Sequence, residues 1–394
     1  MFWFACAAIV AFLAWKTKEE AITLPFAAAG IIALTGAWRA AACTALLPFG
    51  LLAARWPSLL HLRAAVAENR ELASAGLGAA LDPVTYFLTS MKGAVFYYLR
   101  LYLLPAGQSA DPYIKPVSGF ADPSFLAATI ILASLVALGF AMRSDRLFLF
   151  GLMVLLISPL ASYAVMPLAD VLAEHRIYIS GLGFALLAAW VLARLPCYRY
   201  ATLSGVAVIL GIATLIRVGV WTDSLSLWKD AEAKSPELAR PHLNLGMAYQ
   251  AAGIDNLAME EYRHALAVNP RLAPAYIDMA GLFFSHNDLD SSETALKKAM
   301  DLAPALPAPY INLAQVEMKK GKPEEALNTL NRAPLTSLSY LVHINKGDVY
   351  AQLGRYKEAV TEYQEGARLK PDLHEVAELV KQRINRLKEF GVIR

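Results

Sequence analysis

A repeated unit in the C-terminal half constrains the fold of this chain more than any other feature. Comparing the sequence with itself from residue 239 onward gives periods of 34, 34 and then 33 residues, with units that start near Ala239, Ala273, Pro307 and Tyr340. A unit of this length cannot bury an apolar face alone, so neighbouring units must stack to form a continuous core. The period therefore predicts a helical solenoid over residues 239–373.

The residue types at fixed positions of the unit indicate pairs of antiparallel helices. Small residues recur at positions 8, 20 and 27, as at Ala258 and Ala265, and Pro270, Pro304 and Pro371 stand at position 32. Small residues let two helices cross closely, and proline ends the second helix. The third unit departs from the pattern near residues 332–337. Together these positions form the tetratricopeptide pattern.

Both flanks of the array fit the same architecture. Residues 223–238 carry Trp228, Ala231 and Pro236 in the register of positions 24, 27 and 32, which predicts a second helix without its first. Residues 374–394 contain an amphipathic, charged stretch of the kind that caps a solenoid.

Position 6 of the unit holds a short polar side chain in every repeat. The four residues are Asn244, Asp278, Asn312 and Asn345. This position lies on the first helix of each pair, so a ladder of amides could hydrogen-bond an extended peptide in a groove whatever the peptide's sequence. The alternative is that asparagine is simply tolerated on a polar helix face.

The N-terminal half has a different composition. Residues 1–222 contain 25 charged side chains, whereas residues 223–394 contain 44. Apolar stretches close to the roughly 20 residues of a membrane-spanning helix occur at about 1–15, 21–37, 40–54, 124–142, 147–167, 177–194 and 201–220. The predicted fold is therefore all-α: a multi-spanning membrane domain at 1–222, followed by the repeats.

Basic residues in short loops predict the orientation of these helices. Residues 142–146 and 194–199 are short and basic, which is typical of cytoplasmic loops. Alternation then places residues 168–176 and the whole repeat domain on the extracytoplasmic face. The basic stretch 55–70 opposes this assignment.

Residues 84–105 combine Lys92 and Arg100 with four tyrosines, Tyr86, Tyr97, Tyr98 and Tyr102. This composition predicts a helix lying in the membrane interface with its rings at headgroup level. The alternative is an eighth, imperfect span.

Several site classes find no support in the sequence. Residues 1–15 lack the basic region and cleavage site of a signal peptide, so we interpret them as a spanning helix and the chain as starting part-way through a larger membrane domain. The three cysteines show no metal-type spacing, and we expect neither a metal site nor a cofactor. The net charge of +3 does not suggest nucleic acid.

The order of motifs resembles the TMTC-like membrane proteins of the GT-C superfamily of glycosyltransferases. The matching stretches are EHRIYISGLGF at 174–184, WTDSLSLW at 221–228, KEEAITLPF at 18–26 and LLPAGQSADPY at 103–113. The resemblance implies a polyprenyl-phosphate sugar as donor substrate and a polypeptide acceptor held by the repeats. The acidic catalytic loop of that superfamily precedes the region covered here, so the catalytic residues are unknown.

The resemblance also gives a role to a polar cluster between two apolar stretches. Arg176 would bind the lipid phosphate as a bidentate donor, with Glu174 orienting its guanidinium group and His175 and Tyr178 beside it. Lys18 and Glu19 form a second pair of the same kind. The alternative is a polar loop end with Arg176 reaching the headgroups.

Two functions follow from these features. The first is a component of a polyprenyl-phosphate-sugar-dependent protein O-glycosyltransferase whose repeats bind the acceptor polypeptide. The second is a non-enzymatic membrane scaffold that presents a repeat groove to protein partners during envelope assembly. In both, the partners are membrane lipid and a polypeptide.

Overall fold

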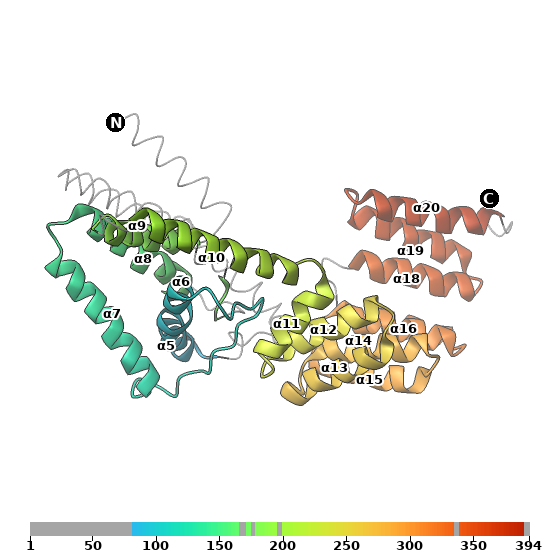
Figure 1. Ribbon diagram of the computed structural model, residues 1–394. Coiled ribbons are helices and arrows are strands. Elements are labelled where there is room, and N and C mark those ends of the chain that lie inside the picture. Colours follow the sequence, from blue (N-terminus) through green and yellow to red (C-terminus); the bar gives the residue numbers. More distant parts are fainter. Residues whose placement is uncertain (1–80, 165–170, 175–177, 195–198, 335–338, 390–394) are drawn as a thin grey trace, which may run out of the picture. The chain divides into compact units, whose positions relative to one another are not determined.

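The computed structural model describes residues 81–164, 171–174, 178–194, 199–334 and 339–389. In this part of the chain the regular secondary structure is entirely helical (Figure 1). The chain divides into two compact units, Met1–Pro241 and His242–Arg394. Each unit is described separately below.

The N-terminal unit opens with a composite helix. It consists of α5 (Pro83–Gly93), the π-helical turn η3 (Ala94–Leu99) and α6 (Arg100–Leu103). Asp82 caps its start, because its carboxylate accepts hydrogen bonds from the backbone N–H groups of Val84 and Thr85, each at 3.0 Å.

The composite helix packs into the protein through its tyrosines. Tyr86, Tyr97 and Tyr98 are buried in one apolar cluster with Leu101, Ile114, Val171 and Leu172. Protein side chains cover these three rings, and the predicted position of the helix at headgroup level is not tested. Their burial depends on residues 114 and 171–172, which are distant in sequence.

Four apolar helices follow: α7 (Pro123–Ala141), α8 (Arg146–Ala164), α9 (Tyr178–Leu192) and α10 (Arg199–Val220). In the described residues, α7 is long and apolar enough to cross a membrane by itself. The segment Ser204–Val220 meets the same requirement together with Ser224–Lys234, across a bend of 109°. One or two such helices are weak evidence for a membrane domain, so the multi-spanning arrangement remains a prediction. The predicted spans at 1–15, 21–37 and 40–54 lie outside the described residues.

Glycines allow α8 and α9 to approach closely. A Cβ atom added at Gly183 would clash with the backbone nitrogen of Leu155 and would lie 2.6 Å from the carbonyl oxygen of Gly151. Only glycine at this position permits such backbone contact. Gly183 belongs to the SGLGF part of the EHRIYISGLGF stretch, so this glycine has a packing role.

Asp145 and Arg194 lie at the same end of the α8–α9 pair. Asp145, in the turn before α8, accepts a hydrogen bond from Trp190 Nε1 at 2.5 Å and forms an ion pair with Arg194 at 2.7 Å. Both partners lie at or just beyond the C-terminal end of α9. The last helix of this unit is α11 (Ser224–Lys234), which Asp223 caps through the N–H of Ser226 at 2.8 Å.

The C-terminal unit is built from successive helix pairs. The pairs are α12 (Ala239–Ala251) with α13 (Asp255–Val268), α14 (Ala273–Ser285) with α15 (Leu289–Leu302), α16 (Pro307–Lys319) with α17 (Pro323–Asn331), and α18 (Ser339–Gln352) with α19 (Tyr356–Leu369), followed by α20 (His374–Glu389). Within the unit, α14 to α17 pack as adjacent layers (Figure 1).

The turn inside each pair repeats one backbone conformation. Position 15 of the unit has a positive φ in all four repeats: 73° at Gly253, 61° at Asn287 and 75° at both Gly321 and Gly354. Glycine enters this left-handed region without a steric penalty, and asparagine is among the few other residues that tolerate it. The same turn therefore joins the two helices of every repeat.

Small residues bring the helices of each pair together. Ala258, Ala265, Ala299, Ala326 and Ala359 occupy positions 20 or 27 and are completely buried. A larger side chain at these positions would force the helices apart. The core of the unit is therefore continuous from one pair to the next.

Candidate functional sites

Glu174 is the member of the predicted donor cluster whose side chain the structure describes. Its Oε1 atom accepts a hydrogen bond from the hydroxyl of Tyr97 and another from the backbone N–H of Ser109, both at 2.7 Å. The expected role of orienting Arg176 is not tested, because His175, Arg176, Lys18 and Glu19 lie outside the described residues. For Tyr178 the structure describes the backbone, which begins α9.

The loop after α6 connects Glu174 to the start of the repeats. Ser109 contacts Glu174 through its N–H, and its hydroxyl accepts a hydrogen bond from the N–H of Asp111 at 3.2 Å. The Asp111 carboxylate is buried and accepts from Arg240 Nε at 2.6 Å and from a second nitrogen of the same guanidinium at 2.5 Å. This bidentate pair is the strongest type of charge-assisted contact that a carboxylate makes.

Two further bonds fix the same loop to the end of α11. Ser235 donates its hydroxyl hydrogen to the carbonyl of Asp111 at 2.7 Å and accepts from the N–H of Tyr113 at 3.1 Å. Lys234 donates to the carbonyl of Gln108 at 2.6 Å. The sequence did not indicate these contacts between residues 108–113 and residues 234–240, because the partners are more than 120 residues apart in the chain. The LLPAGQSADPY motif contains only the first group of residues.

A cleft of about 440 Å³ lies on the first helices of three successive repeats. It is lined by Phe284 from α14, by Ala314, Gln315, Met318 and Lys319 from α16, and by Asn345, Asp348, Val349 and Gln352 from α18. The lining combines apolar side chains with three side-chain amides and one charge of each sign. The ammonium group of Lys319 lies 4.5 Å from the ring centre of Phe284, a cation–π contact.

Of the four residues predicted to form a groove ladder, Asn345 lines this cleft. Its Nδ2 donates to the carbonyl of Leu341 at 2.8 Å, and its Oδ1 accepts from Gln315 Nε2 at 3.2 Å. Asn244, Asp278 and Asn312 are half-buried at the equivalent positions of α12, α14 and α16. Burial raises the pKa of Asp278 to about 6. The polar lining that the sequence did not indicate comes from Gln315 and Gln352.

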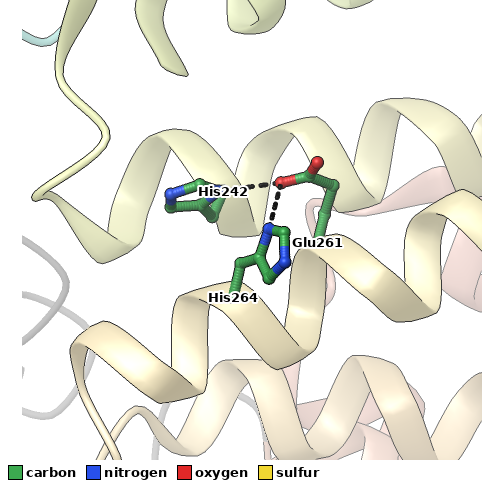
Figure 2. Close-up of side chains that lie close together, drawn as sticks. All are labelled: His242, Glu261 and His264. Atoms are coloured by element: carbon green, nitrogen blue, oxygen red, sulfur yellow. Dashed lines mark hydrogen bonds and ion pairs between the residues drawn. The ribbon is translucent and has the colours of Figure 1, made fainter. Parts of the chain in front are cut away.

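Two imidazoles and a carboxylate meet between α12 and α13 (Figure 2). His242 Nδ1 lies 2.8 Å from Glu261 Oε2, and His264 Nδ1 lies 4.0 Å from the same oxygen. The rings of His242 and His264 are perpendicular, with centres 5.5 Å apart. The sequence shows no metal-type spacing and therefore predicted no metal site. The three residues come from two helices and meet only in the fold.

The family comparison addresses the second half of the chain. Residues 199–389 match the model of a family described as "tetratricopeptide repeat-like domain". This chain carries a tetratricopeptide repeat (TPR)-like domain. The matched region includes the WTDSLSLW stretch and does not reach the 18–26, 103–113 and 174–184 stretches on which the GT-C resemblance rests. The predicted helical-repeat fold is thus confirmed, and the glycosyltransferase relation is not.

Several solved structures resemble part of the chain. The TPR protein TTC0263 of Thermus thermophilus is 18% identical with a TM-score of 0.37, over 44% of this chain and 95% of that one. PilF of Pseudomonas aeruginosa is 22% identical with a TM-score of 0.34, over 46% and 88%. MamA is 19% identical with a TM-score of 0.34, over 41% and 94%. No curated protein matches the chain.

Proposed function

We propose that the TPR domain binds an extended polypeptide in the cleft formed by α14, α16 and α18. The observation that carries this proposal is the composition of the cleft, where Gln315, Asn345 and Gln352 stand beside Phe284, Met318 and Val349. A side-chain amide can donate to a peptide carbonyl and accept from a peptide N–H, so it recognises main chain of any sequence. The apolar residues supply pockets for alternate side chains of such a peptide.

The two charged residues of the cleft would set a preference on top of this main-chain binding. Lys319 and Asp348 come from adjacent first helices, α16 and α18. A peptide with one acidic and one basic side chain would complement them and would be favoured over a peptide with the charges removed.

The test uses the full-length protein and a random peptide-display library. We expect selected peptides to bind wild-type protein and to lose affinity when Gln315 and Asn345 are both changed to Ala. The matched control is the Asn244→Ala, Asn312→Ala double variant, which alters the same register outside the cleft. An equal loss of peptide affinity in the control would indicate recognition along the whole predicted ladder. Unchanged peptide binding by Q315A/N345A would refute the cleft as the binding site.

The finer assignment is that this polypeptide is the acceptor of a membrane-bound protein O-glycosyltransferase. It is supported by the resemblance of the 174–184 stretch and by the hydrogen bonds from Tyr97 and Ser109 that fix Glu174, its first residue. In this proposal Glu174, His175, Arg176, Tyr178, Lys18 and Glu19 bind a polyprenyl-phosphate sugar. Transfer of radiolabelled sugar that persists undiminished in an Arg176→Ala protein would contradict it.

The second candidate is a non-enzymatic scaffold for envelope assembly. It requires peptide binding in the cleft and no site for a sugar donor. It is favoured because the TPR domain alone accounts for the described groove. Peptide capture that is insensitive to Arg176→Ala, with no sugar transfer by the wild type, would support the scaffold.

Both candidates place the chain in a membrane with the TPR domain on the extracytoplasmic face. Asp145, in the first loop assigned to the cytoplasm, pairs with Arg194, the first residue of the second, and this contact supports the topology. Protease added to intact spheroplasts should then digest the TPR domain. Protection of the domain until the membrane is lysed would reverse the orientation.

A further inference from the structure

We propose that His242, Glu261 and His264 bind a divalent transition-metal ion of the Zn²⁺ class. One ligand atom from each residue, an imidazole nitrogen from each histidine and a carboxylate oxygen from Glu261, lies within 4.8 Å of the other two (Figure 2). This site lies between α12 and α13, and none of its residues lines the peptide cleft. The inference therefore stands independently of the proposed function.

The distances suit zinc after only a small movement of the side chains. Zinc binds imidazole nitrogen and carboxylate oxygen at about 2.0–2.1 Å, so tetrahedral ligand atoms lie about 3.3 Å apart. The observed separations of 2.8 Å and 4.0 Å fall on either side of that value. The His264–Glu261 pair reaches that value if His264 Nδ1 moves about 0.7 Å closer to Glu261 Oε2.

The helix positions make the site a clip between the two helices of one repeat. Glu261 and His264 are three residues apart on α13, so their side chains project from the same face. His242 approaches from α12. A metal ion held by all three would crosslink the antiparallel pair.

The chemistry of the ligands selects the class of ion. Imidazole favours zinc and its neighbours in the transition series over magnesium or calcium, which prefer sets made only of oxygen. The His242 and Glu261 side chains are 7% and 16% exposed, whereas His264 is 53% exposed. With three protein ligands, the fourth position opens to solvent beside His264, as in zinc sites that exchange their fourth ligand.

The fourth repeat offers a natural comparison for this site. His343 Nδ1 lies 2.6 Å from Glu362 Oε2, and the two residues are 19 apart in sequence, as are His242 and Glu261. At the position of His264 the fourth repeat has Glu365, whose carboxylate accepts from Arg368 Nε at 2.7 Å. The His–Glu pair therefore occurs without a third ligand, and His264 is the residue that completes the metal site.

The experiment titrates Zn²⁺ into full-length protein that has been stripped with a chelator, in competition with a chromophoric chelator. We expect about one tight site in the wild type, weakened at least ~100-fold by His264→Ala, because losing a direct ligand should cost no less than losing an outer-shell partner. The matched variant His343→Ala should bind as the wild type does. Cys6, Cys43 and Cys197 remain in every protein, so they cannot account for a difference.

A spectroscopic readout separates binding from folding. Co²⁺ should give the visible absorption of a tetrahedral site with the wild type and with His343→Ala, and not with His264→Ala. His264 is exposed, so its replacement should leave the metal-free circular dichroism unchanged. Equal zinc affinity of the wild type and His264→Ala would overturn the proposal, as would a loss of zinc binding in His343→Ala equal to that in His264→Ala.

Discussion

The first and fourth repeats of the TPR domain use one packing arrangement, and the second and third use another. At position 4 the outer repeats have His242 and His343, each bonded to a glutamate of the second helix. The inner repeats have Tyr276 and Tyr310 there, and each donates its hydroxyl to the carbonyl of a proline, Pro270 or Pro304, at 3.3 Å. The same pair of helices therefore accommodates two different sets of side-chain contacts.

The same division appears where the two helices of a repeat cross. The outer repeats place a glycine at position 8 under a tyrosine at position 24, as Gly246 under Tyr262. The inner repeats place an alanine under a leucine, as Ala280 with Leu296. The larger ring needs the smaller neighbour, so the two positions change together. The paired exchange keeps the space between the two helices filled in both kinds of repeat.

A buried tyrosine also brings a hydroxyl into the core that needs an acceptor. Tyr262 donates to Gln250 Oε1 at 2.6 Å, and Tyr363 donates to Asp348 Oδ1 at 2.7 Å. The inner leucines have no such requirement. The outer arrangement therefore gains a hydrogen bond and depends on one more residue for its stability.

The largest effect should come from removing the ring that defines the outer repeats. Tyr262→Ala and Tyr363→Ala should each lower the free energy of unfolding by about 3–5 kcal/mol, because a nearly fully buried aromatic side chain leaves a cavity. Urea unfolding of the full-length protein, followed by circular dichroism, measures this loss. Tyr→Phe at either position keeps the ring and should cost only about 1 kcal/mol. If Tyr262→Ala lowered the free energy of unfolding by less than about 1 kcal/mol, the helices would have closed over the cavity.

The next largest effect should come from the glycine under the ring. A Cβ atom at Gly246 would lie 2.5 Å from the Tyr262 ring. Gly246→Ala should therefore destabilise the protein by about 1–3 kcal/mol, although alanine is the better helix former. Adding Tyr262→Leu should recover part of this loss, because the pair then resembles the inner repeats.

Gly281 provides the control for that experiment. It is exposed in the middle of α14, and its nearest neighbour to an added Cβ atom is Gln250 Nε2 at 3.9 Å. Gly281→Ala should raise the free energy of unfolding by up to about 1 kcal/mol through helix propensity alone. If Gly246→Ala were stabilising to the same degree, the close packing of Gly246 and Tyr262 would be disproved.

The sequence predicted the repeats closely but did not indicate the cleft or the His–Glu–His cluster, for a physical reason. The units predicted to start at Ala239, Ala273 and Pro307 coincide with the first residues of α12, α14 and α16, because the pattern that forms these helices is local. The cleft and the His–Glu–His cluster depend on which faces of separate helices meet. That information is carried by packing between residues distant in the chain.

The buried tyrosines of the N-terminal unit show the same limit. Tyr86, Tyr97 and Tyr98 beside Lys92 suggested an interfacial helix, since aromatic and basic residues are common there. Their rings are covered by residues such as Ile114 and Leu172, which nothing in the 84–105 stretch indicates.

A smaller effect, and one that depends on pH, should come from position 6. Asp278 stands in the second repeat where both outer repeats have asparagine, and burial raises its pKa from 3.8 to about 6. The folded state therefore holds the proton more tightly than the unfolded state. The contribution of Asp278 to stability is therefore greatest below about pH 4 and is lost as the pH rises through about 6.

Asp278→Asn removes the ionisation and should give the second repeat the amide of the outer repeats. At pH 8 the variant should be more stable than the wild type by about 1–2 kcal/mol, and the difference should shrink as the pH falls toward 4. Unfolding curves at several pH values measure it. The reverse change, Asn312→Asp, should introduce the same pH dependence into the third repeat. A constant difference across the pH range would show that ionisation of Asp278 is not its cause.

The smallest change in stability should come from converting the fourth repeat into the first. Glu365→His with Arg368→Ala reproduces His264 and Ala267 of the first repeat around the existing His343–Glu362 pair. The lost ion pair is exposed, with its side chains 70% and 35% accessible, so its removal should change the stability of the metal-free protein very little. Zinc binding should respond far more: about two equivalents in the double variant against about one in the wild type. In the double variant the two repeats differ little around the metal ligands. If the zinc stoichiometry still stayed at one, features of the first repeat other than the side chains of His242, Glu261 and His264 would determine binding.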